Sequence, residues 1–310
     1  MNAGLVAAVS ALFGLPIGSF LNVVIWRVPR NESVVHPPSH CPGCDNAIAP
    51  HDNIPVVSWL LLRGKCRHCK TAINTRYPLV EAFTALTFGI VGWRFAESIV
   101  VVGLLIFSAA LIALCAIDLE HMLLPNKVIY PTAAMVLPLF ALAAGVDDQW
   151  SQLGRATLGG LAGFSIFYAI WFVAPRAMGF GDVRLSALLG FVAAYFGWQV
   201  FGAAMLLPFV IGSIAGIAVG APIVLAPMAV VGAIAYIYGE RLIRGLTGVG
   251  ADDPAGARLT AAGALSIFVG AGTFLVLSAL NKVERGRHIP FGPSLALGTL
   301  IAVLAHGVTI

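Results

Sequence analysis

The sequence contains few charged residues. Asp, Glu, Lys and Arg make up 10% of its 310 residues, whereas hydrophobic residues make up 59% and the mean hydropathy is +0.92. Soluble globular domains carry roughly a quarter charged residues, so this composition excludes that class. Apolar stretches long enough to cross about 30 Å of hydrocarbon recur along the whole chain. The composition therefore predicts an all-α polytopic integral membrane protein.

Heptads, low-complexity tracts and clear internal repeats are also missing. The first apolar stretch, residues 5–26, lacks the basic leader and the small-residue cleavage site of a signal peptide, so we expect it to remain as a transmembrane helix. Hydropathy predicts about ten transmembrane helices in all. They span residues 4–26, 79–95, 98–118, 127–145, 157–175, 183–197, 199–220, 222–239, 259–280 and 291–309.

Basic residues are concentrated in residues 27–78, the largest polar segment. This segment holds seven of the eighteen Lys and Arg residues, so the positive-inside rule places it in the cytoplasm and the N-terminus outside. We expect a plasma (inner) membrane protein with five parts. These are a first helix (1–26), a cytoplasmic loop domain (27–78), a transmembrane core (79–220), an extra pair of helices (221–281) and a C-terminal helix (282–310).

Four of the five cysteines lie in this polar segment as two close pairs, Cys41 with Cys44 and Cys66 with Cys69. Such pairs form disulfides, bind metal or stay free. A reducing cytoplasm argues against disulfides, and two C-x-x-C turns supply the four thiolates that structural Zn²⁺ prefers. The spacing therefore predicts a small zinc-binding loop domain. The fifth cysteine, Cys115, is expected to be an apolar core residue.

Acidic residues near the predicted helices are rare enough to be functional candidates. Asp118 ends the third predicted helix and Asp182 opens the sixth, with two crossings between them, so both carboxylates are expected at the same membrane face. Two carboxylates in a partly dehydrated site take different pKa values. One then activates a water molecule while the other donates a proton to a carbonyl oxygen, which hydrolyses an amide.

Two less specific interpretations stay open for these acids. Asp182 could simply cap the start of its helix, and Asp118 could be an interfacial acid at a helix end. The pair would also suit a transporter or an assembly scaffold that uses intramembrane acids for ion movement. For a hydrolase, Gly179 and Gly181 would let a substrate strand approach closely, because glycine has no Cβ.

Taken together, the motifs resemble those of the type IV prepilin peptidases, which belong to the GxGD aspartyl protease group. The match runs in order along nearly the whole chain. It comprises GSFLNVVIWRVP (18–29), CPGC (41–44), RGKCRHC (63–69), RYPLVEA (76–82), DLEHMLLPN (118–126), GFGDVRLSALLG (179–190) and IPFGPSLALG (289–298).

This resemblance implies that Asp118 and Asp182 are the catalytic aspartates, with Glu81 as a secondary candidate near the active site. It implies a prepilin or pseudopilin substrate, cleaved at the cytoplasmic face of the lipid bilayer, and no nucleic-acid partner. Many members of the family also methylate the new N-terminus with S-adenosylmethionine, which leaves a peptidase without methyltransferase activity as the alternative. No G-x-G-x-x-G motif follows a predicted strand.

The chain departs from the family pattern at three places. Asn126 stands where the first motif usually ends in aspartate, and Arg184 stands where lysine is common. About sixty additional residues precede the last motif, and an even number of inserted crossings would leave the final helix in its usual orientation.

Overall fold

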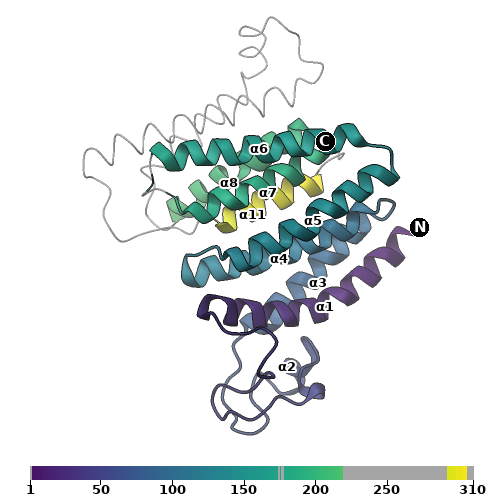
Figure 1. Cartoon of the computed structure of the whole chain (residues 1–310). Coiled ribbons are helices and arrows are strands. Elements are labelled where there is room, and N and C mark those ends of the chain that lie inside the picture. The colour runs from purple at the N-terminus through teal and green to yellow at the C-terminus, as the bar shows by residue number, and fades with distance from the viewer. Residues whose placement is uncertain (1, 174, 176–177, 219–291, 306–310) are drawn as a thin grey trace, which may run out of the picture. The chain divides into compact units, whose positions relative to one another are not determined.

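The computed structural model describes residues 2–173, 175, 178–218 and 292–305, all of them helical or irregular apart from isolated β-bridges (Figure 1). The chain divides into two compact units, Met1–Ala143 and Ala144–Ile310, which are described separately.

The first unit is built on helices α1 (Ala3–Arg27), α3 (Arg76–Arg94) and α4 (Val100–His121) and most of α5 (Asn126–Val146). A small irregular domain lies at one end of it. Between α1 and α3, the chain forms the cysteine domain, residues 28–75, which projects from the same end of both helices (Figure 1). This domain contains two short 3-10 turns, Val28–Arg30 and Pro50–Asp52, and the short helix α2 (Val57–Leu61).

Helices α1 and α3 are so close that their backbones touch. A Cβ on Gly14 would lie 2.6 Å from the Cα of Ala85, and a Cβ on Gly18 would lie 2.7 Å from the Cα of Glu81. Real Cβ atoms do not approach other atoms so closely, so only glycine fits at these two positions of α1. Small residues of this kind let membrane helices pack through extensive van der Waals contact.

Helix α4 ends in a left-handed C-cap. Met122 has φ 52° and its amide donates to the carbonyl oxygen of Asp118 at 2.9 Å. Such a cap satisfies a carbonyl that the last turn leaves free, and Pro125 follows three residues later, as is common after a helix end. Helix α5 (Asn126–Val146) then begins at Asn126. The cap places Asp118 in the last turn of α4.

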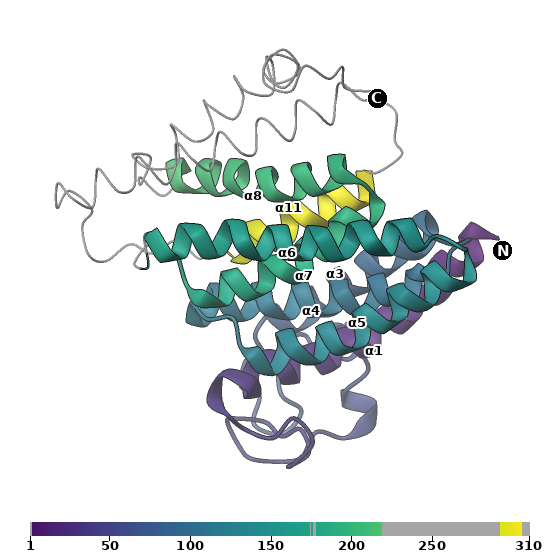
Figure 2. The ribbon, with the colours of Figure 1, turned by 45° about the horizontal axis from the view of Figure 1, so that its top comes forward.

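The described residues of the second unit form helices that pack in pairs. These are α6 (Trp150–Val173), α7 (Phe180–Phe196), α8 (Trp198–Ala218) and α11 (Gly292–Ala305). Helix α6 packs along α7, and α8 lies beside α11, as Figures 1 and 2 both show. The Arg155 guanidinium of α6 donates to the carbonyl oxygens of Ala194 and Tyr195, both at 2.7 Å, and so caps the C-terminus of α7.

The structure confirms a mostly helical protein, and eight of the ten predicted helices occur as helices close to their predicted positions. The other two, 222–239 and 259–280, lie outside the described residues, as does most of the predicted segment 221–281. Within the described part, four helical segments are long and apolar enough to cross a membrane. They are Ala3–Arg30, Val100–His121, Asn126–Val146 and Trp150–Val173.

Helix α7 begins three residues earlier than predicted, at Phe180. With 17 residues it is about 26 Å long at 1.5 Å per residue. This is slightly less than the roughly 30 Å of a bilayer's hydrocarbon core. The difference at its start matters, because Asp182 lies inside the first turn of α7 and not ahead of it.

The contact between α6 and α7 gives a test of the packing. A Cβ on Gly163 would lie 2.6 Å from the backbone oxygen of Ser186, whereas a Cβ on Gly154 of the same helix would meet nothing within 4 Å. We expect Gly163→Ala to destabilise the protein by about 1–3 kcal/mol through overpacking. Gly154→Ala should leave its stability unchanged or raise it by less than about 1 kcal/mol. Thermal unfolding in detergent measures the stability of both variants. Equal unfolding midpoints for the two would contradict the close packing of α6 against α7.

Candidate functional site

The cysteine domain contains the same turn twice. In the first, the Cys41 amide donates to the Asn46 oxygen at 2.9 Å, and the Asp45 amide donates back to the Cys41 oxygen at 2.8 Å. In the second, Cys66 bonds to Thr71 at 2.9 Å, and Lys70 donates back to Cys66 at 3.1 Å. Asp45 and Lys70, which occupy equivalent positions, have φ 55° and 62°. Each C-x-x-C sequence therefore folds into a knuckle that points both of its sulfurs the same way.

The two knuckles face each other and bring four sulfurs together. The Sγ atoms of Cys41, Cys44, Cys66 and Cys69 all lie within 4.8 Å of one another. The Cys41 and Cys69 sulfurs are 3.7 Å apart. A tetrahedral ion with metal–sulfur bonds of about 2.3 Å needs sulfurs about 3.8 Å apart. The arrangement thus fits one metal ion with four sulfur ligands, and the four predicted cysteines lie together in it.

The four thiols do not share protons equally in the absence of an ion. The Gly43 amide lowers the pKa of Cys41, but burial and hydrogen bonds with the other thiols outweigh it and raise the pKa to about 11. The Thr71 hydroxyl and amide lower the pKa of Cys69 to about 6. Amides of Cys69 and His68 lower the pKa of Cys66. A bound cation would favour the thiolate at every position.

Two further contacts hold the rest of the cysteine domain together. Arg67 binds Asp52 through two hydrogen bonds of 2.7 Å and 2.6 Å, and these bonds lower the pKa of the Asp52 carboxyl. The Trp59 indole of α2 donates to the Ile73 oxygen at 3.2 Å. The middle of the domain is thus joined to the second knuckle.

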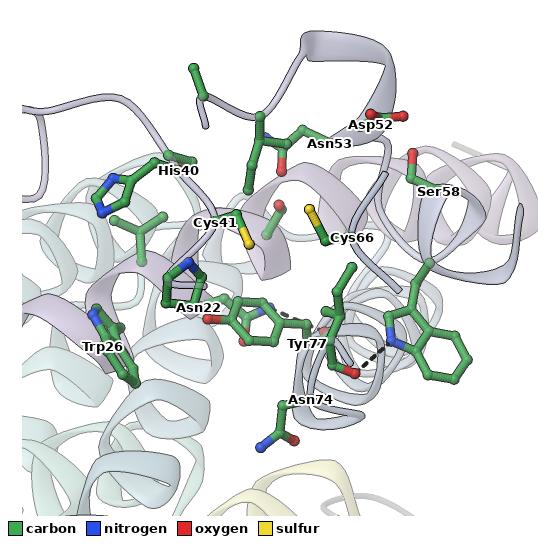
Figure 3. Close-up of a pocket in the computed structure, with 18 of the residues that line it drawn as sticks. Asn22, Trp26, His40, Cys41, Asp52, Asn53, Ser58, Cys66, Asn74 and Tyr77 are labelled. Atoms are coloured by element: carbon green, nitrogen blue, oxygen red, sulfur yellow. Dashed lines mark hydrogen bonds between the residues drawn. The ribbon is translucent and has the colours of Figure 1, made fainter. Parts of the chain in front are cut away.

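A cavity of about 1010 Å³ lies where the cysteine domain meets α1 and α3 (Figure 3). Its walls include Asn22 and Trp26 of α1, Tyr77 of α3, and the knuckle residues Cys41 and Cys66. Ligand-binding pockets have volumes of about 300–1000 Å³. The cavity is therefore large enough for a cofactor or for the end of a peptide chain.

Glu81 closes one side of this cavity. Its side chain is 7% exposed, and its Oε2 accepts a hydrogen bond from the Val56 amide at 2.7 Å. The Ser19 hydroxyl donates to the same carboxylate. Val56 has φ 60° and ψ −50°, and the Val57 amide donates to the Pro55 oxygen at 2.6 Å. This is a γ-turn with positive φ, a rare conformation for a β-branched residue.

Asn22 is the most deeply buried polar residue on the cavity wall, at 2% exposed. Its Nδ2 donates to the backbone oxygens of Gly18 at 3.3 Å and Tyr77 at 3.1 Å. Two carbonyl acceptors determine which end of the side-chain amide is nitrogen. The Oδ1 atom, which is buried, has no hydrogen-bond partner.

Asp118 lies in the first unit, 6% exposed, in the last turn of α4. Glu120, two residues further on, binds Arg76 at the start of α3, with both carboxylate oxygens 2.7 Å from Nη1. This ion pair fastens the end of α4 to the point where the cysteine domain joins α3.

Asp182 lies in the second unit, 8% exposed, in the first turn of α7. Gly179 is the N-cap of this helix, with extended backbone, and its oxygen accepts from the Asp182 amide at 3.1 Å. A Cβ on Gly179 would lie 3.5 Å from Oδ2 of Asp182, which is an ordinary van der Waals distance. Gly181, half-buried, is the second residue of α7. The catalytic roles assigned to these residues stay predictions.

The structure adds two features to the candidates from the sequence. Asn22 belongs to the GSFLN motif. The motif does not show that its Oδ1 atom is buried and unpaired, because this depends on the position of α3. The γ-turn at Val56 has no sequence signal, because valine favours extended backbone. Glu81, the secondary candidate, accepts bonds from a backbone amide and a hydroxyl on the cavity wall.

Two family sequence models match the chain. The bacterial peptidase A24 N-terminal domain matches residues 12–95, and the type IV leader peptidase family matches residues 105–221. The second match ends where the predicted extra segment 221–281 begins.

Several curated proteins are similar to the chain over most of their own length. The prepilin leader peptidase/N-methyltransferase of Pseudomonas aeruginosa is 36% identical over 268 residues, which cover 75% of this chain and 90% of that protein. The protein of the same name from Neisseria gonorrhoeae is 36% identical, with coverage of 67% and 80%. The type 4 prepilin-like proteins leader peptide-processing enzyme of Escherichia coli is 40% identical, with coverage of 57% and 73%. No solved structure gives a significant match.

Metal binding by the cysteine cluster should release protons. At pH 7 a Cys41 thiol with a pKa of about 11 is protonated and must lose its proton to bind, whereas Cys69, with a pKa of about 6, is mostly thiolate already. Titration of metal-free protein with Zn²⁺ in buffers of different ionisation enthalpy should show one ion bound and at least one proton released per chain.

The affinity for Zn²⁺ should fall as the pH is lowered through about 6, where protons also compete for Cys69. A Cys115→Ser variant should bind the same amount of metal, because this cysteine lies in α4 and outside the cluster. Binding that releases no proton at pH 7 would contradict the interpretation of the cluster.

Proposed function

Because the chain belongs to the type IV leader peptidase family, we propose that it is a membrane aspartyl endopeptidase with a second, N-methyltransferase activity. It would remove the leader peptide of type IV prepilins or pseudopilins and methylate the new N-terminus. The observation that carries this proposal is a pair of buried acids at helix ends, Asp118 in the last turn of α4 and Asp182 in the first turn of α7.

The order of the helices supports a shared site for these acids. Two membrane-length helices, α5 and α6, separate the end of α4 from the start of α7. Two crossings return the chain to the membrane face from which it left, so both acids belong to the same face. The Lys and Arg residues of the cysteine domain support a cytoplasmic assignment for that face, in an inner membrane with the N-terminus outside.

The chemistry follows from two carboxylates that share one water molecule. One carboxylate takes a proton as the water oxygen attacks the scissile carbonyl carbon, while the other, protonated, donates to the carbonyl oxygen. The tetrahedral intermediate then collapses, the C–N bond breaks, and a carboxyl proton passes to the leaving nitrogen. The products are the free leader and a new N-terminal amine. Gly179 and Gly181, which have no Cβ, would let the substrate backbone approach this site closely.

The cysteine domain would supply a structural ion and a surface for the second reaction. Cys41, Cys44, Cys66 and Cys69 would hold Zn²⁺, which would fasten the two knuckles without an open coordination position. S-adenosylmethionine, when bound, would supply an electrophilic methyl group. The names of the relatives support this second activity.

Substitution of either aspartate tests the proposal. Asp118→Asn and Asp182→Asn should each lower the rate of prepilin cleavage by at least about 100-fold, because the amide can neither accept the proton from water nor return it. Glu120→Gln is a matched control at the end of α4. Its carboxylate binds Arg76 and is 38% exposed, so its loss should change the rate less than about threefold.

Cleavage is measured with purified protein and a full-length prepilin, and the product is identified by mass spectrometry. Either asparagine variant with wild-type activity would exclude the carboxylate pair as the catalytic group.

A further inference from the structure

We propose that the cavity between the cysteine domain and helices α1 and α3 is an ammonium-binding site, in which the Oδ1 of Asn22 and the carboxylate of Glu81 are the acceptors. Both residues line the cavity and both are more than nine-tenths buried. The inference rests on the proposed methyltransferase activity, for which it names the binding site.

Asn22 shows what kind of ligand the cavity suits. Its two N–H groups are held by the backbone oxygens of Gly18 and Tyr77, so its carbonyl oxygen is the end that stays unpaired. A buried acceptor without a donor costs about 1–3 kcal/mol. Native proteins rarely leave such atoms unsatisfied, so an unpaired one suggests that a ligand donates to it. The ligand must therefore carry an N–H or O–H donor.

Glu81 shows that this ligand should be positively charged. Its carboxylate receives hydrogen bonds from the Val56 amide and the Ser19 hydroxyl, both of which are neutral. Within the described residues, no Lys, Arg or His lies within salt-bridge distance of it. Buried charges are normally paired with an opposite charge. Three arginines line the cavity, but Arg27 binds backbone oxygens, Arg67 binds Asp52 and Arg76 binds Glu120. A ligand cation would therefore be the positive charge that pairs with Glu81.

The backbone around Glu81 is arranged to hold this carboxylate in place. The positive φ of Val56 directs its amide at Oε2, at a conformational cost on the order of 1–3 kcal/mol. The close contact between Gly18 and the Cα of Glu81 holds the backbone of Glu81 against α1. Strained backbone of this kind is concentrated at functional sites, and here it orients a charged acceptor on a cavity wall.

Two ammonium groups take part in N-terminal methylation. One is the α-ammonium of the newly cleaved substrate, and the other is that of the amino-acid part of the methyl donor. In the transfer, the substrate nitrogen loses a proton to solvent and forms the new N–C bond, while the donor's S–C bond breaks and its sulfonium becomes a neutral thioether. Either ammonium group would be held in the same way, by the amide oxygen of Asn22 and the carboxylate of Glu81.

Glu81→Gln tests the site, because it removes the charge and keeps the shape and an acceptor for Val56. Binding is measured by calorimetry on the full-length, Zn²⁺-loaded protein. One pair of probes is S-adenosylhomocysteine and methylthioadenosine, which lacks the amino-acid part. The other pair is a cleaved-substrate peptide with a free or an acetylated N-terminus. Wild type should bind the probe with the free amine about 10–100-fold more tightly in at least one pair, the range expected for a charge-assisted hydrogen bond.

Glu81→Gln should abolish that preference. If the preference for S-adenosylhomocysteine over methylthioadenosine is lost, the site binds the methyl donor. If the preference for the free over the acetylated peptide is lost, the site binds the substrate N-terminus. Glu81→Asp, which retains the negative charge, should keep part of the preference for the probe with the free amine. Glu32→Gln is the matched control, since Glu32 lines the same cavity but is exposed. The preference should survive this change.

The proposal is overturned if wild type shows no preference in either pair, or if Glu81→Gln and Glu32→Gln behave alike. Prepilin cleavage in the same preparations separates this result from a failure of the peptidase assignment. A wild-type protein that cleaves no prepilin would reject the proposed function and leave the binding comparison readable. Equal losses of cleavage and of binding by Glu81→Gln would show a structural role and reject the site.

Discussion

The close contact between α1 and α3 is the constraint on which the rest of the first unit depends. Because Gly14 and Gly18 have no side chains, the two backbones touch, and Asn22 can reach the Tyr77 oxygen across the interface. Ser19 reaches Glu81 in the same way. The chain between these helices must leave and return at adjacent points, which brings two distant C-x-x-C turns within reach of one another. A larger residue at Gly18 would separate the helices and disturb the cavity and the carboxylate together.

Charge is scarce in this protein, and the described charged residues that are well buried lie at helix ends or at the cysteine domain. Arg27 donates to the oxygens of Ser33 and Pro37 and ties the start of that domain to α1. Arg76 holds Glu120 near the end of α4. Each such residue costs desolvation free energy that a partner must offset. Glu81 also has only neutral protein partners, and its place on the cavity wall points to a ligand cation.

The sequence predicts the helices well because their apolar runs are long. It predicts the cysteine cluster because two C-x-x-C turns in one polar loop are typical of a four-sulfur site. The predicted start of α7 is too late, since hydropathy begins at Val183 whereas the helix already includes Phe180 and Asp182. The cavity could not be predicted at all. The unpaired oxygen of Asn22 and the positive φ of Val56 arise from contacts between residues far apart in the chain, and neither leaves a periodic pattern.

The central claim is that the carboxylates of Asp118 and Asp182 share one water molecule. The most direct test is a double variant, Asp118→Cys with Asp182→Cys, in a Cys115→Ser background and with Zn²⁺ protecting the cysteine cluster. A short bifunctional thiol reagent should link positions 118 and 182, as identified by mass spectrometry of the digested protein. The pair Glu120→Cys with Asp182→Cys should react less. If a folded, metal-loaded double variant gives no link between 118 and 182, the two aspartates do not form one site.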